Sequence, residues 1–201
     1  MNPTHRDIVI SPQHILEQLK TTQKRKAPGH DSITYEHITK MAPHIVYQLA
    51  DIYTASLDYG VVPWQWKHGK LVILKKPSKP DDQPSSYRPI TLLPTFGKLL
   101  EQCVKPHLEN QRNLHPQQYA YQKGKSAEDA IHSVINFISS SDHLYPITLF
   151  IDIKGAFDNM WHPHLLAELR RHQINPKLYT WVKNYLTDRH VSLHDPDATH
   201  N

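Results

Sequence analysis

The fold of this chain is decided by one stretch, Leu149-Phe150-Ile151-Asp152-Ile153-Lys154-Gly155-Ala156-Phe157-Asp158. The run 147–151 is apolar and rich in β-branched and aromatic residues, which predicts a buried strand. Asp152 follows where that strand would end. An ionised carboxylate is costly to bury without a partner, so Asp152 requires a cation, a hydrogen-bond cluster or a metal. A structural aspartate that caps the following turn explains the same pattern equally well.

Length and composition allow a folded chain with its own core. The sequence has 201 residues, of which 38% are hydrophobic, which suits one domain or a domain and a half. The mean hydropathy is −0.60 and no apolar run is long enough to span a bilayer, so we expect no membrane partner. Residues 1–7 lack the apolar segment of a signal peptide. The one cysteine, Cys103, has no disulfide partner in the chain, which favours an intracellular location, cytoplasmic or nuclear.

The charge balance permits a polyanionic partner without requiring one. Lysine and arginine number 23 against 19 acidic residues, a net charge of +4. The 16 histidines are scattered and show no zinc-binding spacing, which favours solvated surface histidines over a zinc site. The 16 prolines against 6 glycines predict short elements rather than a long bundle or a repeat array.

Five stretches carry the start signals and apolar spacing of helices. They begin near Pro12, Pro43, Pro94, Ser126 and Asn175. The second is expected to end at Gly60, and the third to place Cys103 in the core. The fourth has one apolar face, made of Ile131, Val134, Ile135 and Ile138.

A strand–loop–strand unit is expected between the second and third helices. The apolar runs 71–74 and 90–93 flank a polar, proline-rich loop, 77–86, which we expect to be mobile. We predict that the two runs pair as antiparallel strands, with Lys76 and Arg88 beside the loop. Two surface cations that merely flank a loop would give the same pattern.

The stretch around Asp152 resembles motif A of reverse transcriptases, in the form used by non-LTR retrotransposons of the LINE or jockey-like kind. The resemblance implies that Asp152 is the catalytic aspartate that binds Mg²⁺. It also implies that Phe157 packs under the sugar of the incoming nucleotide and excludes ribonucleotides. We expect Phe157 and Asp152 on one rim, because an extended path followed by a turn returns the chain to the same pocket.

The strand–loop–strand unit resembles the fingers hairpin of the same family. The matching residues are Trp66-Lys67 and Lys76 in its first half and Ser86-Tyr87-Arg88-Pro89-Ile90 in its second. The resemblance implies that Lys76 and Arg88 grip the triphosphate of a deoxynucleotide. This role is physically reasonable, because fixed cations stabilise the charge of the leaving pyrophosphate and arginine can donate two parallel hydrogen bonds to a phosphate.

A basic arm precedes a sharp turn near the N-terminus. Lys24, Arg25 and Lys26 stand before Pro28-Gly29, an arrangement that suits either a charged linker or a contact with a nucleic-acid backbone. The segment Lys26-Ala27-Pro28-Gly29, with Asp31 two places on, resembles the K-x-P-G-x-D element of the family.

Residues 114–126 resemble the family segment that leads template and nucleotide into the site. This segment carries Lys123 and Lys125, which we expect to contact nucleic acid. It departs from the family at Gln122, where arginine is usual, and at Ala120, where glycine is usual. The first departure removes a positive charge and the second restricts the backbone.

Two family features do not occur between Asp158 and the final residue. Nucleotidyl transfer uses two magnesium ions roughly 3.5–4 Å apart, which one aspartate cannot hold. The family supplies further carboxylates from an aromatic-Ala-Asp-Asp hairpin that follows a Gly-x-Pro-Gln-Gly segment, and neither is present. The Asp81-Asp82 pair lies in the proline-rich loop instead. We therefore expect a domain truncated within its palm and inactive alone.

The resemblance implies an α+β, right-hand polymerase fold. We expect an N-terminal extension (1–23), a fingers-like part (24–146), the start of the palm (147–190) and a disordered tail (191–201). The implied function is that of a partial RNA-directed DNA polymerase whose partners are an RNA template, a DNA primer and deoxynucleotides. The alternatives are a catalytically dead nucleic-acid-binding relic and a residual reading frame that does not fold stably.

Overall fold

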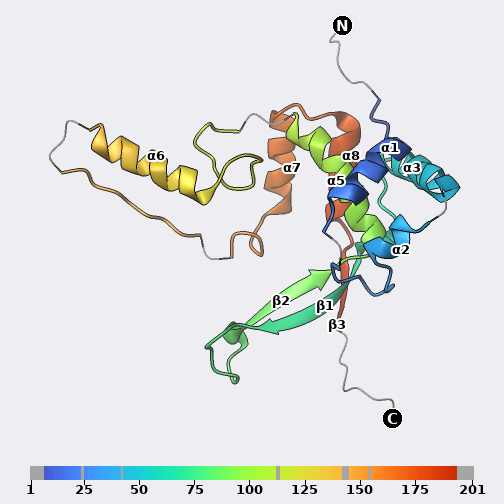
Figure 1. Ribbon diagram of the computed structural model, residues 1–201, viewed down its shortest axis with the longest axis horizontal. Helices are drawn as coiled ribbons and strands as arrows, with labels where there is room; N and C mark the ends of the chain where they lie inside the picture. The colour runs from blue at the N-terminus through green and yellow to red at the C-terminus, as the bar shows by residue number, and fades with distance from the viewer. Residues whose placement is uncertain are drawn as a thin grey trace, which may run out of the picture. The chain divides into compact units, whose positions relative to one another are not determined.

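The computed structural model describes residues 7–23, 25–41, 43–111, 114–141, 145–153 and 155–193. They form helices and a small sheet, so the α+β class predicted from the sequence is confirmed (Figure 1). The chain divides into two compact units. The first unit comprises residues 1–111 and 166–201, and the second comprises residues 112–165.

Helices account for most of the regular structure. They are α1 (Pro12–Thr21), α2 (Tyr35–Thr39), α3 (Pro43–Asp58), α4 (Trp64–Lys67), α5 (Thr95–Glu109), α6 (Ala127–Ser139), α7 (His162–Arg171) and α8 (Pro176–Leu186). The strands are β1 (His68–Lys75), β2 (Tyr87–Leu92) and β3 (His190–Leu193), and a 3₁₀ turn, η1 (Pro84–Ser86), precedes β2. No helix in the described ranges is both long and apolar enough to cross a membrane.

The predicted helix boundaries are confirmed by the capping contacts. Ser11 Oγ accepts from the backbone N–H of His14 at 3.1 Å, and Asn175 Oδ1 accepts from Lys177 at 2.8 Å. Each cap satisfies one of the first N–H groups, which have no partner within a helix. After α3, Gly60 takes a φ of +62°, the left-handed conformation that ends many helices.

The core of the first unit lies between α1, α3, α5 and α8. Its most enclosed side chains include Ile15, Tyr53, Leu57, Leu99 and Leu178, each 0% exposed. Cys103 is also fully buried, and burial raises the pKa of its thiol to about 12. The predicted role of Cys103 as a small core residue is confirmed, because such a thiol does not ionise at neutral pH.

The N-terminal residues contribute to this core. Ile8 and Ile10 are buried, and the backbone N–H of Ile10 donates to Thr54 Oγ1 at 3.0 Å. Residues 7–21, which lie in the predicted N-terminal extension, are therefore an integral part of the first unit. The predicted boundary between fingers and palm at 146/147 does not coincide with a unit boundary, and it stays a prediction.

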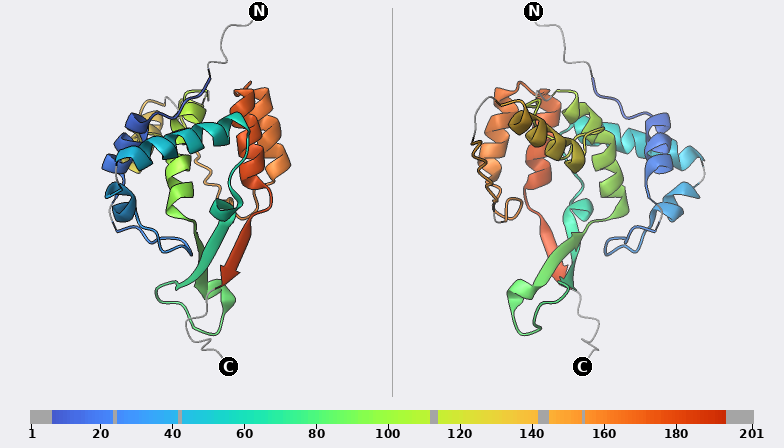
Figure 2. Two further views of the ribbon diagram at one scale, coloured as in Figure 1. Left: turned by 90° about the vertical axis from the view of Figure 1, so that its right-hand side faces the viewer. Right: turned by 60° about the vertical axis from the view of Figure 1, so that its left-hand side comes forward.

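The sheet has the strand order β2-β1-β3, with β2 antiparallel and β3 parallel to β1. Its strands extend away from the helices of the first unit, with the loop between β1 and β2 at the tip (Figures 1 and 2). Pro89 is tolerated because β2 is an edge strand, where a residue without an N–H can face solvent.

Strand β3 corrects the prediction that the chain is disordered from residue 191. Val191 and Leu193 are the parallel partners of Gly69 and Leu71. The second edge of β1 otherwise presents unpaired backbone groups, and a short β-prone segment satisfies them. Residues 194–201 of the predicted tail lie outside the described residues.

The predicted strand at 147–151 is wrong. These residues have no regular secondary structure, and Ile147, Leu149 and Phe150 are 96%, 79% and 85% exposed. A strand that is apolar on both faces requires neighbouring strands and a covering layer. The strands of the described chain pair with one another instead, so no such neighbour is supplied.

Helix α6 forms as predicted but does not bury its apolar face. Ser126 and Asp129 form a capping box, in which Ser126 Oγ accepts from the backbone N–H of Asp129 at 3.1 Å. Ile131 and Ile135 on the apolar face are 58% and 53% exposed. The start of α6 is therefore defined by its local capping contacts, since none of its side chains is buried by the described residues.

Candidate nucleotide and nucleic-acid interface

The β1–β2 hairpin brings Lys76 and Arg88 onto one face of the sheet. Leu74 is the partner of Arg88, and the backbone N–H of Lys76 donates to the carbonyl of Ser86 at 2.8 Å. Opposed residues point to the same face, as do residues two apart along a strand. Lys76 and Arg88 are thus diagonal neighbours, at a spacing of about 7–8 Å. The predicted antiparallel pairing of their strands is confirmed.

The loop at the tip of the hairpin makes ordered contacts. Lys76 Nζ donates to the Ser85 carbonyl at 2.7 Å, and the Tyr87 hydroxyl donates to the Asp81 carbonyl at 2.9 Å. Lys75 forms an ion pair with Asp81, and both side chains are exposed. Such a pair contributes only about 0–1 kcal/mol. A triphosphate that recruits Lys76 has to replace its hydrogen bond to Ser85, whereas the Arg88 side chain is already exposed.

The predicted basic arm is fixed to the first turn of α5. Lys98 Nζ donates to the Ala27 carbonyl at 2.8 Å. Gly29 packs so closely on the chain that an added Cβ would lie 2.6 Å from the Pro94 nitrogen. Arg25 has a φ of +66°, and its N–H donates to Glu36 Oε1 at 2.7 Å. The arm is therefore an ordered loop over the described residues, and not a linker.

The charges on this arm have different surroundings. Arg25 and Lys26 are exposed, whereas Lys24 lies outside the described residues. Burial, and second the charge of Lys26, lower the pKa of Lys98, while Asp31 and Glu101 act in the opposite direction. Lys98 therefore stabilises the arm through its hydrogen bond to the Ala27 carbonyl. The exposed cations Arg25 and Lys26 remain available to bind a polyanion.

In the second unit, Lys125 is used to hold its own loop. Its Nζ donates to the carbonyls of Pro116 and Gln118, the latter at 3.0 Å, and lies 5.0 Å from the centre of the Tyr119 ring. Lys123 is exposed. Of these two predicted nucleic-acid contacts, Lys123 is therefore more available to a ligand than Lys125.

The two departures from the family pattern have different structural consequences. Gln122 Nε2 donates to the Gln118 carbonyl at 2.7 Å, so this side chain helps to close the loop. The positive φ of the turn falls on Tyr121, at 57°, and not on Ala120. The alanine therefore occupies a conformation that any residue can adopt.

Asp152 and Phe157 lie in the second unit. Asp152 is exposed in a segment without regular structure. Phe157 is 74% exposed, and its ring lies edge-on to Tyr121 with 5.9 Å between centroids. The shared pocket of Asp152 and Phe157 stays a prediction.

The described residues do not assemble a metal centre. They contain no group of three or more histidine, cysteine, aspartate or glutamate side chains placed to hold an ion. Asp152 supplies one carboxylate, and the carboxylate of Asp81 is paired with Lys75. A pair of magnesium ions requires several oxygen ligands. The described residues alone therefore do not supply the ligands of a two-metal site.

A polar network between α5 and α8 was not singled out from the sequence. The Tyr185 hydroxyl donates to Glu101 Oε1, and the guanidinium of Arg189 lies 4.4 Å from the centre of the Tyr185 ring. Arg189 also donates to the Tyr185 carbonyl at 3.0 Å. Burial raises the pKa of Glu101, and the bond from Tyr185 lowers it. Lys98 to Glu101 and Trp181 to Arg189 resemble the family's K-x-x-E and W-x-x-x-Y-L-x-x-R segments, but neither spacing indicates that Glu101 and Tyr185 meet.

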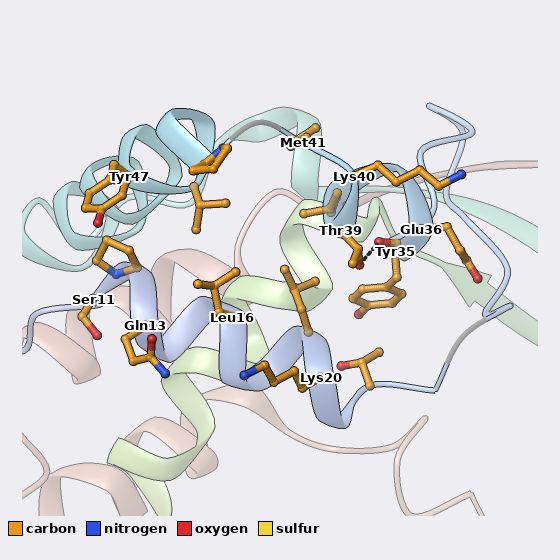
Figure 3. Close-up of a pocket in the computed structure, with 16 residues that line it drawn as sticks. Ser11, Gln13, Leu16, Lys20, Tyr35, Glu36, Thr39, Lys40, Met41 and Tyr47 are labelled. Atoms are coloured by element: carbon orange, nitrogen blue, oxygen red, sulfur yellow. Dashed lines mark hydrogen bonds between the residues drawn. The ribbon is translucent and has the colours of Figure 1, made fainter.

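A cavity of about 890 Å³ opens between α1, α2 and the start of α3. Figure 3 shows Leu16 and Tyr35 among the side chains that line it, together with the charged groups of Lys20, Glu36 and Lys40. None of the site residues predicted from the sequence lines this cavity. It is therefore separate from the candidate nucleotide-binding hairpin.

Comparisons with known proteins agree with the motifs. Residues 73–200 match the family described as reverse transcriptase (RNA-dependent DNA polymerase). The chain is 31% identical over 196 residues to a probable RNA-directed DNA polymerase from transposon BS of Drosophila melanogaster, covering 93% of this chain and 22% of that protein. It is 32% identical over 177 residues to the RNA-directed DNA polymerase from mobile element jockey of the same species, covering 84% and 19%.

A third relative comes from another fly. The chain is 34% identical over 165 residues to the retrovirus-related Pol polyprotein from type-1 retrotransposable element R1 of Bradysia coprophila, covering 80% of this chain and 16% of that protein. The chain thus spans about a fifth of the length of these relatives. The family match covers more than half of the chain, and the chain belongs to the reverse transcriptases of non-LTR retrotransposons.

Proposed function

We propose that this chain forms the nucleotide-binding fingers and the first part of the palm of an RNA-directed DNA polymerase. The observation that carries the proposal is the placement of Lys76 and Arg88 on one face of a paired hairpin. The family match and the names of the relatives support the same reaction class.

The hairpin has the charges and geometry to bind a deoxynucleoside triphosphate. Lys76 directly follows β1 and its N–H donates to the Ser86 carbonyl, and Arg88 lies in the paired strand β2, so the hairpin fixes their backbone separation before a ligand binds. Arg88 can meet a phosphate with two parallel hydrogen bonds, and Lys76 can act as a point charge. Preorganised cations on the leaving phosphates are the main protein contribution to phosphoryl-type transfer.

The second unit would supply the remaining contacts. We assign Asp152 as one magnesium ligand of a centre that further carboxylates must complete, and Phe157 as the residue under the nucleotide sugar. Magnesium would supply charge stabilisation of the transferred phosphate. Asp152 is exposed and therefore accessible to such an ion.

The nucleic-acid partners are an RNA template and a DNA primer. Arg25, Lys26 and Lys123 are exposed and can neutralise phosphates, and we assign Lys24 and Lys125 to the same role. Contacts of this kind give affinity that is independent of sequence and falls with salt. We expect dissociation constants of about 10⁻⁴–10⁻⁶ M at physiological salt.

Binding of a deoxynucleotide tests the hairpin. Titration calorimetry of the chain with dTTP should show that Lys76→Ala and Arg88→Ala each weaken binding by roughly tenfold to a hundredfold, the value of a charged hydrogen bond. Lys79→Ala is the matched control, because Lys79 is an exposed lysine of the same loop. Equal losses in all three variants would show that the loop attracts phosphate only by its overall charge.

Primer extension tests whether the chain is active alone, and dTTP binding separates the polymerase fragment from a nucleic-acid-binding relic. The chain should be incubated with a primed RNA template, deoxynucleotides and magnesium or manganese. We expect no extension, because the described residues supply no complete metal centre. Extension that disappears in Asp152→Ala would show that the chain completes its metal site by other means. Binding of template without any dTTP binding would favour the relic.

A further inference from the structure

Three histidine rings lie in a row at the base of the sheet. His30 belongs to the loop after the basic arm, and His68 and His190 are the first residues of β1 and β3. The ring centroids of His30 and His68 are 5.0 Å apart, and those of His68 and His190 are 6.5 Å apart. His30 and His190 are exposed, and His68 is half-buried. We call these residues the histidine row.

The fold positions the row from three separate segments. The parallel register pairs His68 with His190, so both side chains lie on one face of the sheet. His68 Nε2 lies 2.5 Å from Ser192 Oγ, which limits rotation of the ring. His30 follows Gly29, whose close approach to Pro94 fixes the loop. The rings come together only when the loop of His30 packs against the start of α5 and β3 pairs with β1.

The surroundings of the row are rich in positive charge. The three strands contain no aspartate or glutamate, and Lys70 lies on the same face as His68, two residues along β1. Lys67 precedes β1 and interacts electrostatically with Asp188 and Arg189, which precede β3, while Lys26 and Asp31 share the loop of His30. Lys67 is buried, and burial lowers its pKa. Cations outnumber carboxylates around the row.

Protonation and anion binding are coupled at such a site. Histidine changes its charge between pH 5 and 8. Imidazolium rings at these separations repel one another, and a phosphate bound beside them offsets that repulsion. By linkage, an anion that binds the protonated row must also promote proton uptake.

We propose that the histidine row is a proton-dependent subsite for the phosphodiester backbone of a nucleic-acid strand. The inference rests on the proposed function for the identity of the ligand. His30 lies in the same loop as Arg25 and Lys26 of the basic arm, so one nucleic-acid strand can contact both the arm and the row. From the general chemistry of histidine, we expect tighter RNA binding at pH 6 than at pH 8.

Oligonucleotide binding at two pH values tests the subsite. A fluorescein-labelled 16-nucleotide RNA should be titrated with the chain at pH 8.0 and pH 6.0 across several salt concentrations. The triple variant His30→Gln/His68→Gln/His190→Gln should weaken binding at pH 6.0 by about fivefold to tenfold, and at pH 8.0 by less than about twofold. Its salt slope at pH 6.0 should be shallower by about 0.7 for each phosphate that the row no longer neutralises.

A matched triple variant controls for the loss of histidines outside the row. His44→Gln/His132→Gln/His164→Gln also removes three exposed histidines, none of them in the row. We expect it to bind like the native chain at both pH values. His30→Gln alone serves as a second test, because this exposed loop residue can change without disturbing β1 or β3. This single variant should show part of the loss of RNA binding at pH 6.0 that the triple variant shows.

Proton uptake distinguishes the subsite from a general charge effect. Calorimetry in buffers of different ionisation enthalpy should show that the native chain takes up more protons on RNA binding at pH 6.5 than the triple variant does. Equal losses in the row variant and the control variant, or equal proton uptake, would overturn the inference and leave RNA binding by Arg25, Lys26 and Lys123 intact. Absence of RNA binding at both pH values would overturn the proposed function as well.

Discussion

Similar apolar residues are buried in the first unit of this chain and exposed in the second. In the first unit, Tyr53, Leu57 and Leu99 are 0% exposed. In the second, Ile147 and Phe150 are 96% and 85% exposed, and no described residue from 114 to 165 is buried. The apolar pattern thus identifies residues that favour burial, but the pattern alone does not bury them.

The difference follows from the number of layers. In the first unit α1, α3, α5 and α8 turn their apolar faces toward one another, so each face has a neighbour. Among the described residues of the second unit, α6 is an amphipathic helix and 145–153 has no regular structure. A single amphipathic element cannot exclude water from its own apolar face. The stability of the chain should therefore reside in the first unit.

A pair of leucine substitutions gives the largest expected contrast. Leu99→Ala removes a fully buried side chain between helices and should destabilise the chain by about 2–5 kcal/mol. Leu149→Ala makes the same chemical change at a side chain that is 79% exposed, and should change stability by less than about 0.5 kcal/mol. Urea unfolding followed by circular dichroism measures both values. A similar loss in the two variants would mean that residues 145–153 are packed in solution.

A pair of glycine substitutions tests the same contrast in the backbone. Gly29→Ala places a Cβ 2.6 Å from the Pro94 nitrogen, so the basic arm must shift, at a cost of about 1–3 kcal/mol. Gly124→Ala meets no atom within 4 Å, although its φ of +78° strains any other residue. We expect the second change to leave the urea midpoint of the first unit unaltered. If Gly29→Ala were neutral, the arm would not be packed on α5.

Local signals explain what the sequence predicted correctly. Ser11, Ser126 and Asn175 mark helix starts through contacts that span only two or three residues. The hairpin also follows from local pattern, because two apolar runs separated by a polar loop have few alternatives to pairing. These signals act between near neighbours and do not depend on the rest of the fold.

Long-range partners explain what the sequence did not predict. Strand β3 depends on an open edge of β1 more than 100 residues earlier, and residues 147–151 depend on partner strands that the described residues do not supply. The bond between Tyr185 and Glu101 joins helices α8 and α5, so no local spacing indicates it. Of the site, the placement of Lys76 and Arg88 was predictable, and the histidine row was not.

The network between α5 and α8 predicts a smaller, pH-dependent effect. Burial raises the pKa of Glu101 above its ordinary value of 4.5, so the folded state binds this proton more tightly than the unfolded chain does. The stabilisation is complete below the unfolded pKa and is lost as the pH rises through the folded pKa. Glu101→Gln cannot ionise, yet its amide oxygen can still accept from Tyr185. The variant should therefore lose less stability than the native chain as the pH rises from 4 to 7.

Urea unfolding at a series of pH values measures this difference. Glu109→Gln is the control, because Glu109 is on the same helix and pairs with Lys105 on the surface. It should leave the pH dependence close to that of the native chain. A Glu101→Gln variant with the native pH dependence would show that Glu101 is as solvated in the folded chain as in the unfolded one.

The smallest contrast comes from two serine caps whose hydrogen bonds have the same length and spacing. Ser11 Oγ and Ser126 Oγ each accept from a backbone N–H three residues later at 3.1 Å, but α1 belongs to the first unit and α6 to the second. Loss of such a cap costs about 1 kcal/mol of helix stability. Because α1 forms only with the core, Ser11→Ala should lower the global free energy of unfolding by that amount. Because α6 buries no side chain, Ser126→Ala should instead speed hydrogen exchange along 127–139 and leave the global midpoint unchanged. A shift of the global midpoint by Ser126→Ala would show that α6 unfolds together with the first unit, and the distinction between the two units would then fail.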